Sequence, residues 1–170
     1  MLLNTLQWQI LKPFVDETVH ALEVKLGLTV EADDGFQENV KDFNFNGYAV
    51  VANTAGSVEG RILIHHYTET ALVIGNKILQ AESLSAAEMN GMTDKISNAL
   101  ADFTYLSLEP AVKQLENSDL KVKFSPAFFI ADTSKIDAIL AGITEIITVP
   151  IKVEGVGRFY LNYLLVNKII

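Results

Sequence analysis

Residues 56–79 read GSVEGRILIHHYTETALVIGNKIL and predict a turn, a strand and a helix in direct succession. Gly56 and Gly60 supply the backbone freedom of a tight turn, and the apolar run after them is typical of a strand. Thr68 is a candidate helix N-cap, with Glu69 in the first turn, where a carboxylate favours the helix dipole. No Gly-Lys-Ser/Thr follows the glycines, so this loop is a hairpin turn rather than a phosphate-binding loop.

A helix precedes this stretch. Its apolar positions recur at intervals of four, three and four residues, which places them on one face: Val15, Val19, Leu22 and Leu26. Gly27 is a C-terminal stop. Pro13 fits the first turn of this helix or a kink. A polar connection is expected at residues 31–39.

A longer helix is predicted from about Ser85 to Glu109, ending at Pro110 or resuming through Leu115, and Ser85 and Glu88 have capping-box spacing. Its packing stripe, at intervals of three and four, consists of Met89, Met92, Ile96, Leu100 and Phe103, with Ala99 beside it. The opposite face holds Gly91, Asp94, Asn98, Asp102 and Tyr105. Met92 and its neighbours in the stripe are therefore expected to be buried and Asn98 exposed.

The remaining segments are mostly strand-like. Strands are expected at 43–53, 58–67, 120–124, 126–132, 144–155 and 157–166, and a short helical or irregular link at 135–141. Helices and strands are grouped rather than strictly alternating, which favours an α+β fold. We expect one domain over residues 1–170, with long amphipathic helices packed on a mostly antiparallel sheet.

The composition restricts the partners that the chain can bind. Of 170 residues, 49% are hydrophobic, and 13 basic residues stand against 21 acidic ones, for a formal charge of −8. Nucleic acid needs a positive surface and is not expected as a partner. The apolar content favours some burial between subunits. Cysteine is absent, which excludes disulfides and thiolate metal sites and fits a reducing compartment.

Neither a membrane segment nor a metal site is predicted. The N-terminal MLLNTLQWQILKPF lacks the basic and apolar regions of a signal peptide, and no run reaches the ~18 apolar residues of a membrane span. The expected location is the cytoplasm. His65 and His66 are adjacent on a strand, so their side chains point to opposite faces of the sheet and do not share a metal ion.

Two stretches resemble the CheX-type, CheC-like proteins of bacterial chemotaxis. Residues 56–79 resemble the CheX pattern of a glycine-containing turn, a strand led by Glu-Gly, and a helix that opens with Ser/Thr-Glu-Thr-Ala-Leu. Residues 14–30, FVDETVHALEVKLGLTV, resemble the first helix of that family, which ends in a similar Leu-Gly-hydrophobic stop. The long helix and later strands follow in the same order, so the resemblance spans nearly the whole chain.

The resemblance implies a role in chemotaxis or two-component signalling. CheX-like proteins pair as homodimers through their sheets and dephosphorylate phospho-CheY. Their signature is a Glu followed three residues later by an Asn on the long helix. The Asn amide is thought to orient the attacking water, and the Glu contacts the receiver's conserved lysine. No cofactor of the protein's own is implied, because Mg²⁺ would be supplied by the receiver domain.

The family motif is half present in DKISNALAD (94–102). Asn98 matches the family Asn, whereas the Glu position falls on Lys95. A lysine facing the receiver's lysine is repelled by roughly 1 kcal/mol in water at a few ångströms. Asp94 would supply the acidic contact instead, although it lies ~100° around the helix from Lys95. The predicted catalytic residues are therefore Asn98 and Asp94.

Three functions remain open from the sequence. The first is a phosphatase that acts on a phosphorylated CheY-like receiver. The second is a catalytically impaired dimeric module that binds a receiver or another partner through the same helix face, which Lys95 and the charge of −8 favour. The third is a structural homodimer whose helix face is only solvated. Release of phosphate from phosphorylated receivers distinguishes the first from the other two.

Overall fold

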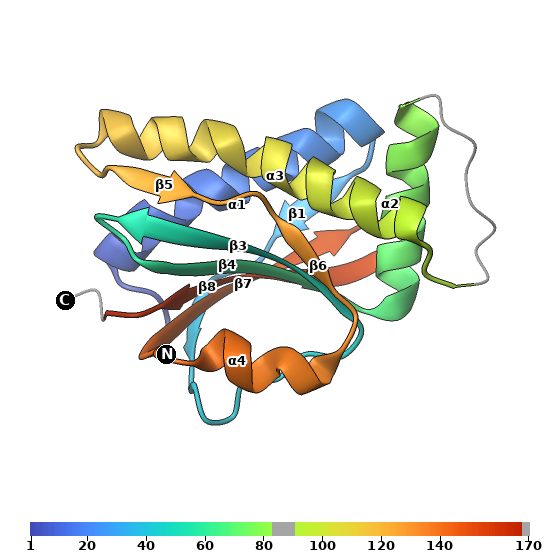
Figure 1. The fold of residues 1–170 in the computed structure, drawn as a ribbon. Helices are drawn as coiled ribbons and strands as arrows, with labels where there is room; N and C mark the ends of the chain where they lie inside the picture. Colours follow the sequence, from blue (N-terminus) through green and yellow to red (C-terminus); the bar gives the residue numbers. More distant parts are fainter. Residues whose placement is uncertain (83–90, 168–170) are drawn as a thin grey trace.

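The computed structural model describes residues 1–82 and 91–167 and has the predicted α+β architecture (Figure 1). The described residues form one sheet with the strand order β1-β7-β8-β4-β3-β5, in which β2 also pairs with β7 and β6 with β3. Every strand pairing is antiparallel. The strands are β1 (Val30–Ala32), β2 (Phe36–Glu38), β3 (Tyr48–Gly56), β4 (Gly60–His66), β5 (Val122–Phe124), β6 (Phe128–Ile130), β7 (Glu145–Val153) and β8 (Gly157–Leu165).

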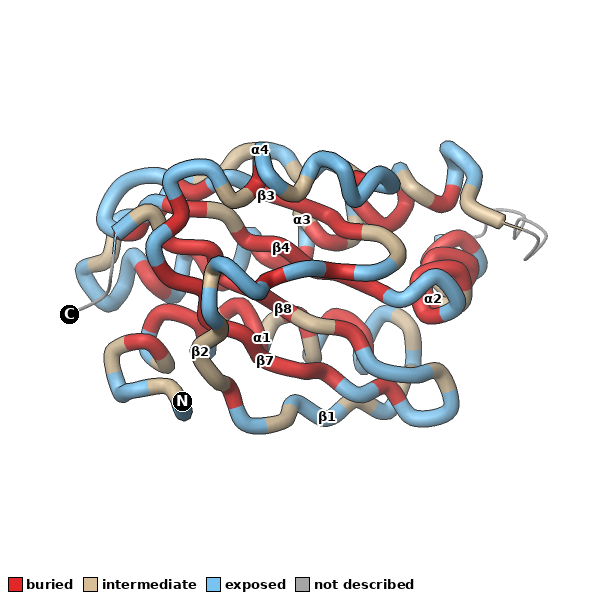
Figure 2. Tube along the Cα trace, turned by 90° about the horizontal axis from the view of Figure 1, so that it is seen from below, coloured by how far each residue is buried: buried red, intermediate tan, exposed pale blue. Residues whose placement is uncertain are grey.

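Three long helices cover one face of the sheet, and a short one covers the other (Figure 1). The first group is α1 (Thr5–Leu26), α2 (Thr68–Ala81) and α3 (Asp94–Asn117), and the short helix is α4 (Ile136–Leu140), preceded by a 3₁₀ turn (Thr133–Lys135). The main core lies between the three long helices and the sheet. A smaller core, which includes Phe43, Phe45 and Ile139, lies on the α4 side. Figure 2 shows the buried positions along β4, β7 and β8, which therefore have both faces covered.

The chain repeats one arrangement twice. Each half consists of a long helix, two three-residue strands, a connecting segment and a long hairpin. The short strands of each half pair with the hairpin of the other half, β1 and β2 with β7, and β5 and β6 with β3. Gly27 (φ 64°), the C-cap of α1, and Asp119 (φ 65°), which follows the C-cap of α3, share the left-handed conformation, and each lies three residues before a short strand. The two halves are therefore joined through a single sheet.

The hairpin and the helix in residues 56–79 are confirmed. β3 and β4 pair from Tyr48 and His66 to Thr54 and Gly60, and α2 follows directly. The cap differs by one position, because Tyr67 is the N-cap and Thr68 is the first helical residue. None of the helices in residues 1–82 and 91–167 is long and apolar enough to cross a membrane.

The predicted start of the long helix is wrong. Residues 91–93 are not helical, and α3 begins at Asp94 because the Thr93 hydroxyl accepts a hydrogen bond from the Ile96 amide at 3.2 Å and caps it. Met89 and the proposed Ser85–Glu88 capping box lie outside the described residues.

Both prolines that were expected near helix ends lie inside helices. Pro110 lies inside α3, which continues to Asn117, so the helix does not stop at Pro110 and the alternative that it extends through Leu115 is confirmed. Pro13 lies inside α1 rather than in its first turn, because Asn4 and Gln7 form a capping box at the true start.

Two of the expected loop and strand boundaries also differ. The polar connection at 31–39 contains β1 and β2, each held by pairing with β7. The strand expected over 43–53 begins only at Tyr48, and Phe43 and Phe45 instead pack into the smaller core from the preceding segment. Apolar residues outside a strand thus cover the second face of the sheet.

Candidate functional site

The N-terminal turns of α3 carry the predicted site. Thr93 caps the helix, and Asp94 is its first residue, where the carboxylate interacts favourably with the helix dipole. The Ser97 hydroxyl donates a hydrogen bond to the Asp94 carbonyl oxygen at 3.0 Å. The backbone that carries Asp94, Lys95 and Asn98 is therefore ordered by the cap and by regular helical bonds.

Asn98 is exposed, as the helical spacing predicts. Its side-chain amide, which carries both a donor and an acceptor, makes no hydrogen bond to the described residues. Asp94 and Asp102 lie one turn before and one turn after it, and both are exposed. This side of α3 can therefore present an amide and two carboxylates to a docked protein.

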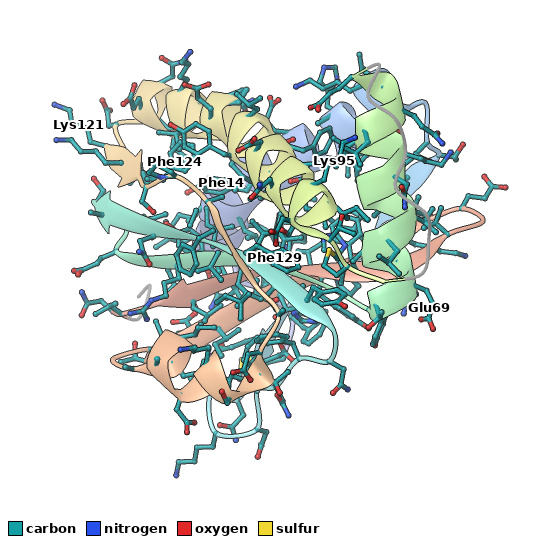
Figure 3. All side chains as sticks on the ribbon, turned by 45° about the vertical axis from the view of Figure 1, so that its right-hand side comes forward. Phe14, Glu69, Lys95, Lys121, Phe124 and Phe129 are labelled. Carbon is teal, nitrogen blue, oxygen red and sulfur yellow. The ribbon has the colours of Figure 1, made fainter. Side chains whose placement is uncertain are left out.

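Lys95 is also exposed and lies at the end of α3 that is next to α2 (Figure 3). It is three residues before Asn98, so the two side chains are neighbours on the helix surface. An ammonium group therefore occupies the position at which the CheX resemblance implies a carboxylate. Asp94 lies on the other side of Asn98, as predicted, and an acidic contact from it requires a different docking angle.

The stripe that buries the opposite side of α3 is partly confirmed. Ile96 and Leu100 are fully buried, whereas Met92 and Phe103 are only partly buried against the same core. The Lys25 ammonium lies 5.8 Å from the centre of the Phe103 ring, at the edge of the α1–α3 contact. Such a distance allows a cation–π contact at a partly exposed position.

Two residues assigned to the exposed face by helical spacing are placed elsewhere. Gly91 precedes the helix. Tyr105 is half-buried because its ring stacks on Phe124 of β5, with centroids 4.8 Å apart and planes inclined at 26°. The exposed stripe instead continues from Asn98 through Asp102 to Leu106, whose side chain is 52% exposed.

Gly75 of α2 allows α2 to pack closely against α3. This role of Gly75 was not identified from the sequence. A Cβ at residue 75 would overlap Ile96 Cγ2 and would lie 3.6 Å from Leu100 Cγ. The absence of a side chain lets α2 and α3 approach closely, two residues from Asn98. An isolated glycine inside a helical pattern, as in LVIGNKIL (72–79), is the sequence signal of such close packing.

The two histidines of β4 lie on opposite faces of the sheet, as predicted. His65 stacks on Phe45 on the α4 side, with centroids 5.9 Å apart, and His66 lies 4.8 Å from the Phe159 ring on the other side. Burial lowers the pKa of His65 to about 4, partly offset by the Asn162 side chain. Burial, and then the charge of His65, lower the pKa of His66 to about 3. Both rings are therefore neutral at pH 7.

Within the described part of the chain, no group of three or more His, Asp or Glu side chains could hold a metal ion. The Nδ1 atoms of His65 and His66 have no hydrogen-bond partner among these residues. Because they lie on opposite faces, the two rings serve packing against separate cores.

Comparison with known proteins finds likeness in structure only. No protein-family model and no curated protein matches the sequence. The CheX protein of Desulfovibrio desulfuricans aligns with a TM-score of 0.73 at 16% identity, over 92% of this chain and 99% of that one. A CheC-like superfamily protein of Shewanella sp. PV-4 aligns with a TM-score of 0.74 at 12% identity, over 96% and 99%.

A third solved structure is a complex. CheX of Borrelia burgdorferi, in the CheX–CheY–BeF3–Mg²⁺ complex, aligns with a TM-score of 0.71 at 21% identity, over 93% of this chain and 98% of that one. At these identities the likeness concerns the arrangement of helices and strands. The chain therefore has the fold of the CheX and CheC-like chemotaxis proteins, as the resemblance of its sequence implies.

Proposed function

We propose that the exposed N-terminal half of α3 docks a phosphorylated CheY-like receiver domain and that Asn98 orients the water that hydrolyses its aspartyl phosphate. The observation that carries the proposal most is the exposure of the Asn98 amide on an ordered helix, with no hydrogen bond to the described residues. The fold is that of CheX proteins, and one of these has been solved together with CheY.

The chemistry requires little from this chain besides position. The oxygen of water attacks the phosphorus, and the bond from phosphorus to the aspartyl oxygen breaks. The products are the receiver carboxylate and dihydrogen phosphate, which carries both protons of the water and releases one of them to solvent near neutral pH. Mg²⁺ bound to the receiver stabilises the charge of the transferring phosphoryl group. The Asn98 carbonyl oxygen accepts a hydrogen bond from the water and holds it in line, and such positioning reduces the entropic part of the barrier.

A second candidate function is receiver binding without hydrolysis. Lys95 favours it, because an ammonium group beside Asn98 repels the receiver's conserved lysine and weakens docking in the productive orientation. Asp94 is exposed on the other side of Asn98 and would supply attraction in a rotated orientation. Both functions use the same face of α3. They differ in the rate of phosphate release and not in the surface that docks the receiver.

The test is phosphate release from a panel of receiver domains from the same genome, phosphorylated with acetyl phosphate in Mg²⁺. We expect this protein to speed dephosphorylation of at least one receiver in proportion to its concentration. Binding to the beryllium fluoride form of that receiver without any acceleration would assign the second function. No binding to any receiver would contradict both.

A further inference from the structure

A cavity of about 510 Å³ lies between the sheet and α4. Helix α4 covers the face of the sheet opposite to α3, which carries Asn98 (Figure 1). Its apolar wall includes Val51 of β3, Ile130 of β6 and Ile139 of α4, and the Phe128 ring, 44% exposed, lies at its opening. Pockets of 300–1,000 Å³ that are mostly apolar, with a few polar groups, are typical of small-molecule sites.

The two connecting segments on this face of the sheet pack in different ways. In the first half of the chain, the corresponding segment between β2 and β3 places Phe43 and Phe45 against His65 on the same face of the sheet. In the second half, the segment between β6 and β7 carries α4 across this face of the sheet (Figure 1). The cavity is lined by residues of α4, of β6 and of the sheet. The first segment thus contributes aromatic rings to the smaller core, whereas the second segment borders an open cavity.

Arg61 of β4 gives the cavity a fixed positive charge. Its Nη1 donates to the Ile139 carbonyl oxygen at 2.7 Å and to the Ala141 carbonyl oxygen at 3.2 Å, so the guanidinium is anchored at the end of α4. Among the described residues, Arg61 forms no ion pair with a carboxylate. A half-buried, anchored guanidinium that has no carboxylate partner among the described residues is suited to a planar anion.

The other charged groups of the cavity leave a net positive lining. Lys135 adds a second cation at the rim. Asp132, the one acidic lining residue, accepts hydrogen bonds from the Ser134 amide at 2.9 Å and the Ser134 hydroxyl at 2.6 Å, within its own turn. Its carboxylate thus caps the 3₁₀ turn and interacts with the nearby charge of Lys135, but it forms no ion pair with Arg61, so the lining keeps a net positive charge centred on Arg61.

We infer that this cavity binds a small aromatic carboxylate, with the carboxylate on Arg61 and Lys135 and the ring against Val51, Phe128 and Ile139. A guanidinium pairs with a carboxylate through two parallel hydrogen bonds, and the free edge of Arg61 is available for them. The Phe128 ring offers an aromatic surface for the body of the ligand. The site is independent of the function proposed for Asn98, because the sheet separates the two.

The test uses 2-naphthoate as the probe and its neutral isostere, 2-naphthamide, as the comparison, with binding measured by calorimetry and by amide chemical shifts. We expect 2-naphthoate to bind with a dissociation constant of about 1 mM or tighter. The amide should bind at least about tenfold more weakly, since it lacks the charge that Arg61 recognises. Shifts should concentrate on β6 and α4.

Variants locate the binding within the cavity. Ala138→Phe places a ring in the space from an exposed position of α4 and should abolish binding. Lys135→Gln should weaken it a few-fold, and Arg61→Met about tenfold or more. Lys123→Gln removes the same charge from an exposed position of β5, outside the cavity, and should leave binding unchanged.

The inference is overturned by any of three results. These are no binding of 2-naphthoate at about 5 mM, equal binding of the acid and the amide, and unchanged binding in Ala138→Phe. Tighter binding of octanoate than of 2-naphthoate would also overturn it, because the site would then select an acyl chain. Arg61→Met removes the hydrogen bonds from Arg61 to the carbonyl groups at the end of α4. If this variant does not fold, Lys135→Gln and Ala138→Phe still test whether the ligand binds in the cavity.

Discussion

Gly75 of α2 and Ile96 of α3 are packed so closely that a Cβ at residue 75 would overlap Ile96 Cγ2. Ile96 is completely buried, and Asn98 is exposed only two residues further along α3. The contact therefore fixes the helix that presents the proposed catalytic amide. The requirement for glycine at residue 75 therefore affects where α3 places Asn98.

The first prediction concerns this contact. Gly75→Ala should lower the free energy of unfolding by about 1–2 kcal/mol, because overpacking of a core outweighs the gain of about 1 kcal/mol in helix propensity. Urea unfolding measures this effect. In an Ile96→Ala background, which removes Cγ2, Gly75→Ala should be neutral or stabilising. Equal effects of Gly75→Ala in both backgrounds would show that the two residues are not coupled.

The second prediction concerns Lys95. Lys95→Glu exchanges a repulsive contact with the receiver's lysine for an attractive one, so phosphate release should rise by about tenfold or more. Asp94→Ala should lower it only modestly, because a carboxylate at a wet interface contributes little. Lys113→Glu makes the same charge change about 27 Å further along the helix and is the control. A loss of activity in Lys95→Glu would mean that the catalytic face has been assigned wrongly.

The third prediction is a dependence of stability on pH. The pKa values of His65 and His66 fall from 6.5 to about 4 and about 3 in the folded protein. Below pH 6.5 the unfolded chain binds protons that the folded protein does not, so the free energy of unfolding should decrease as the pH falls from 6.5 toward 4. Each histidine contributes at most about 1.4 kcal/mol per pH unit.

Urea unfolding at pH 6.5 and 5 measures this decrease. His65→Phe places a ring among Phe45 and Tyr160 and removes one of the two groups, so the decrease should become smaller. A free energy of unfolding that stays constant between these two pH values would show that the histidines are not held neutral by burial.

The fourth prediction concerns assembly. The resemblance to CheX proteins and the hydrophobic content of 49% favour a homodimer. Sedimentation at micromolar concentration should therefore show a species of twice 18.7 kDa. A single species near 18.7 kDa would contradict it.

Local patterns predicted several of the longer elements. The glycine-containing turn of β3 and β4, helix α2, and the burial of Ile96 with exposure of Asn98 all follow from spacing. The candidate site could therefore be predicted because it lies on one helix, α3, whose buried and exposed faces differ in composition.

Features that depend on distant residues were not predictable. Three-residue strands such as β1 show no period and exist only because β7 pairs with them. Tyr105 leaves the exposed face because Phe124, nineteen residues later, stacks on it. The start of α3 was placed too early because the apolar spacing of the sequence continues through Met92, before the helix. The helix itself begins only after its cap at Thr93. The cavity under α4 depends on tertiary placement alone.

The fifth prediction tests the central proposal, the role of Asn98. Asn98→Ala should abolish the acceleration of phosphate release from the phosphorylated receiver while changing its binding to the beryllium fluoride form less than about threefold, since the amide positions water and contributes little docking area. Glu109→Ala, about 16 Å further along the same exposed side of α3, is the matched control and should leave both unchanged. The direct measurement is the rate of phosphate release with saturating wild-type protein or Asn98→Ala. The account predicts the uncatalysed rate for the variant, and hydrolysis at the wild-type rate would contradict it.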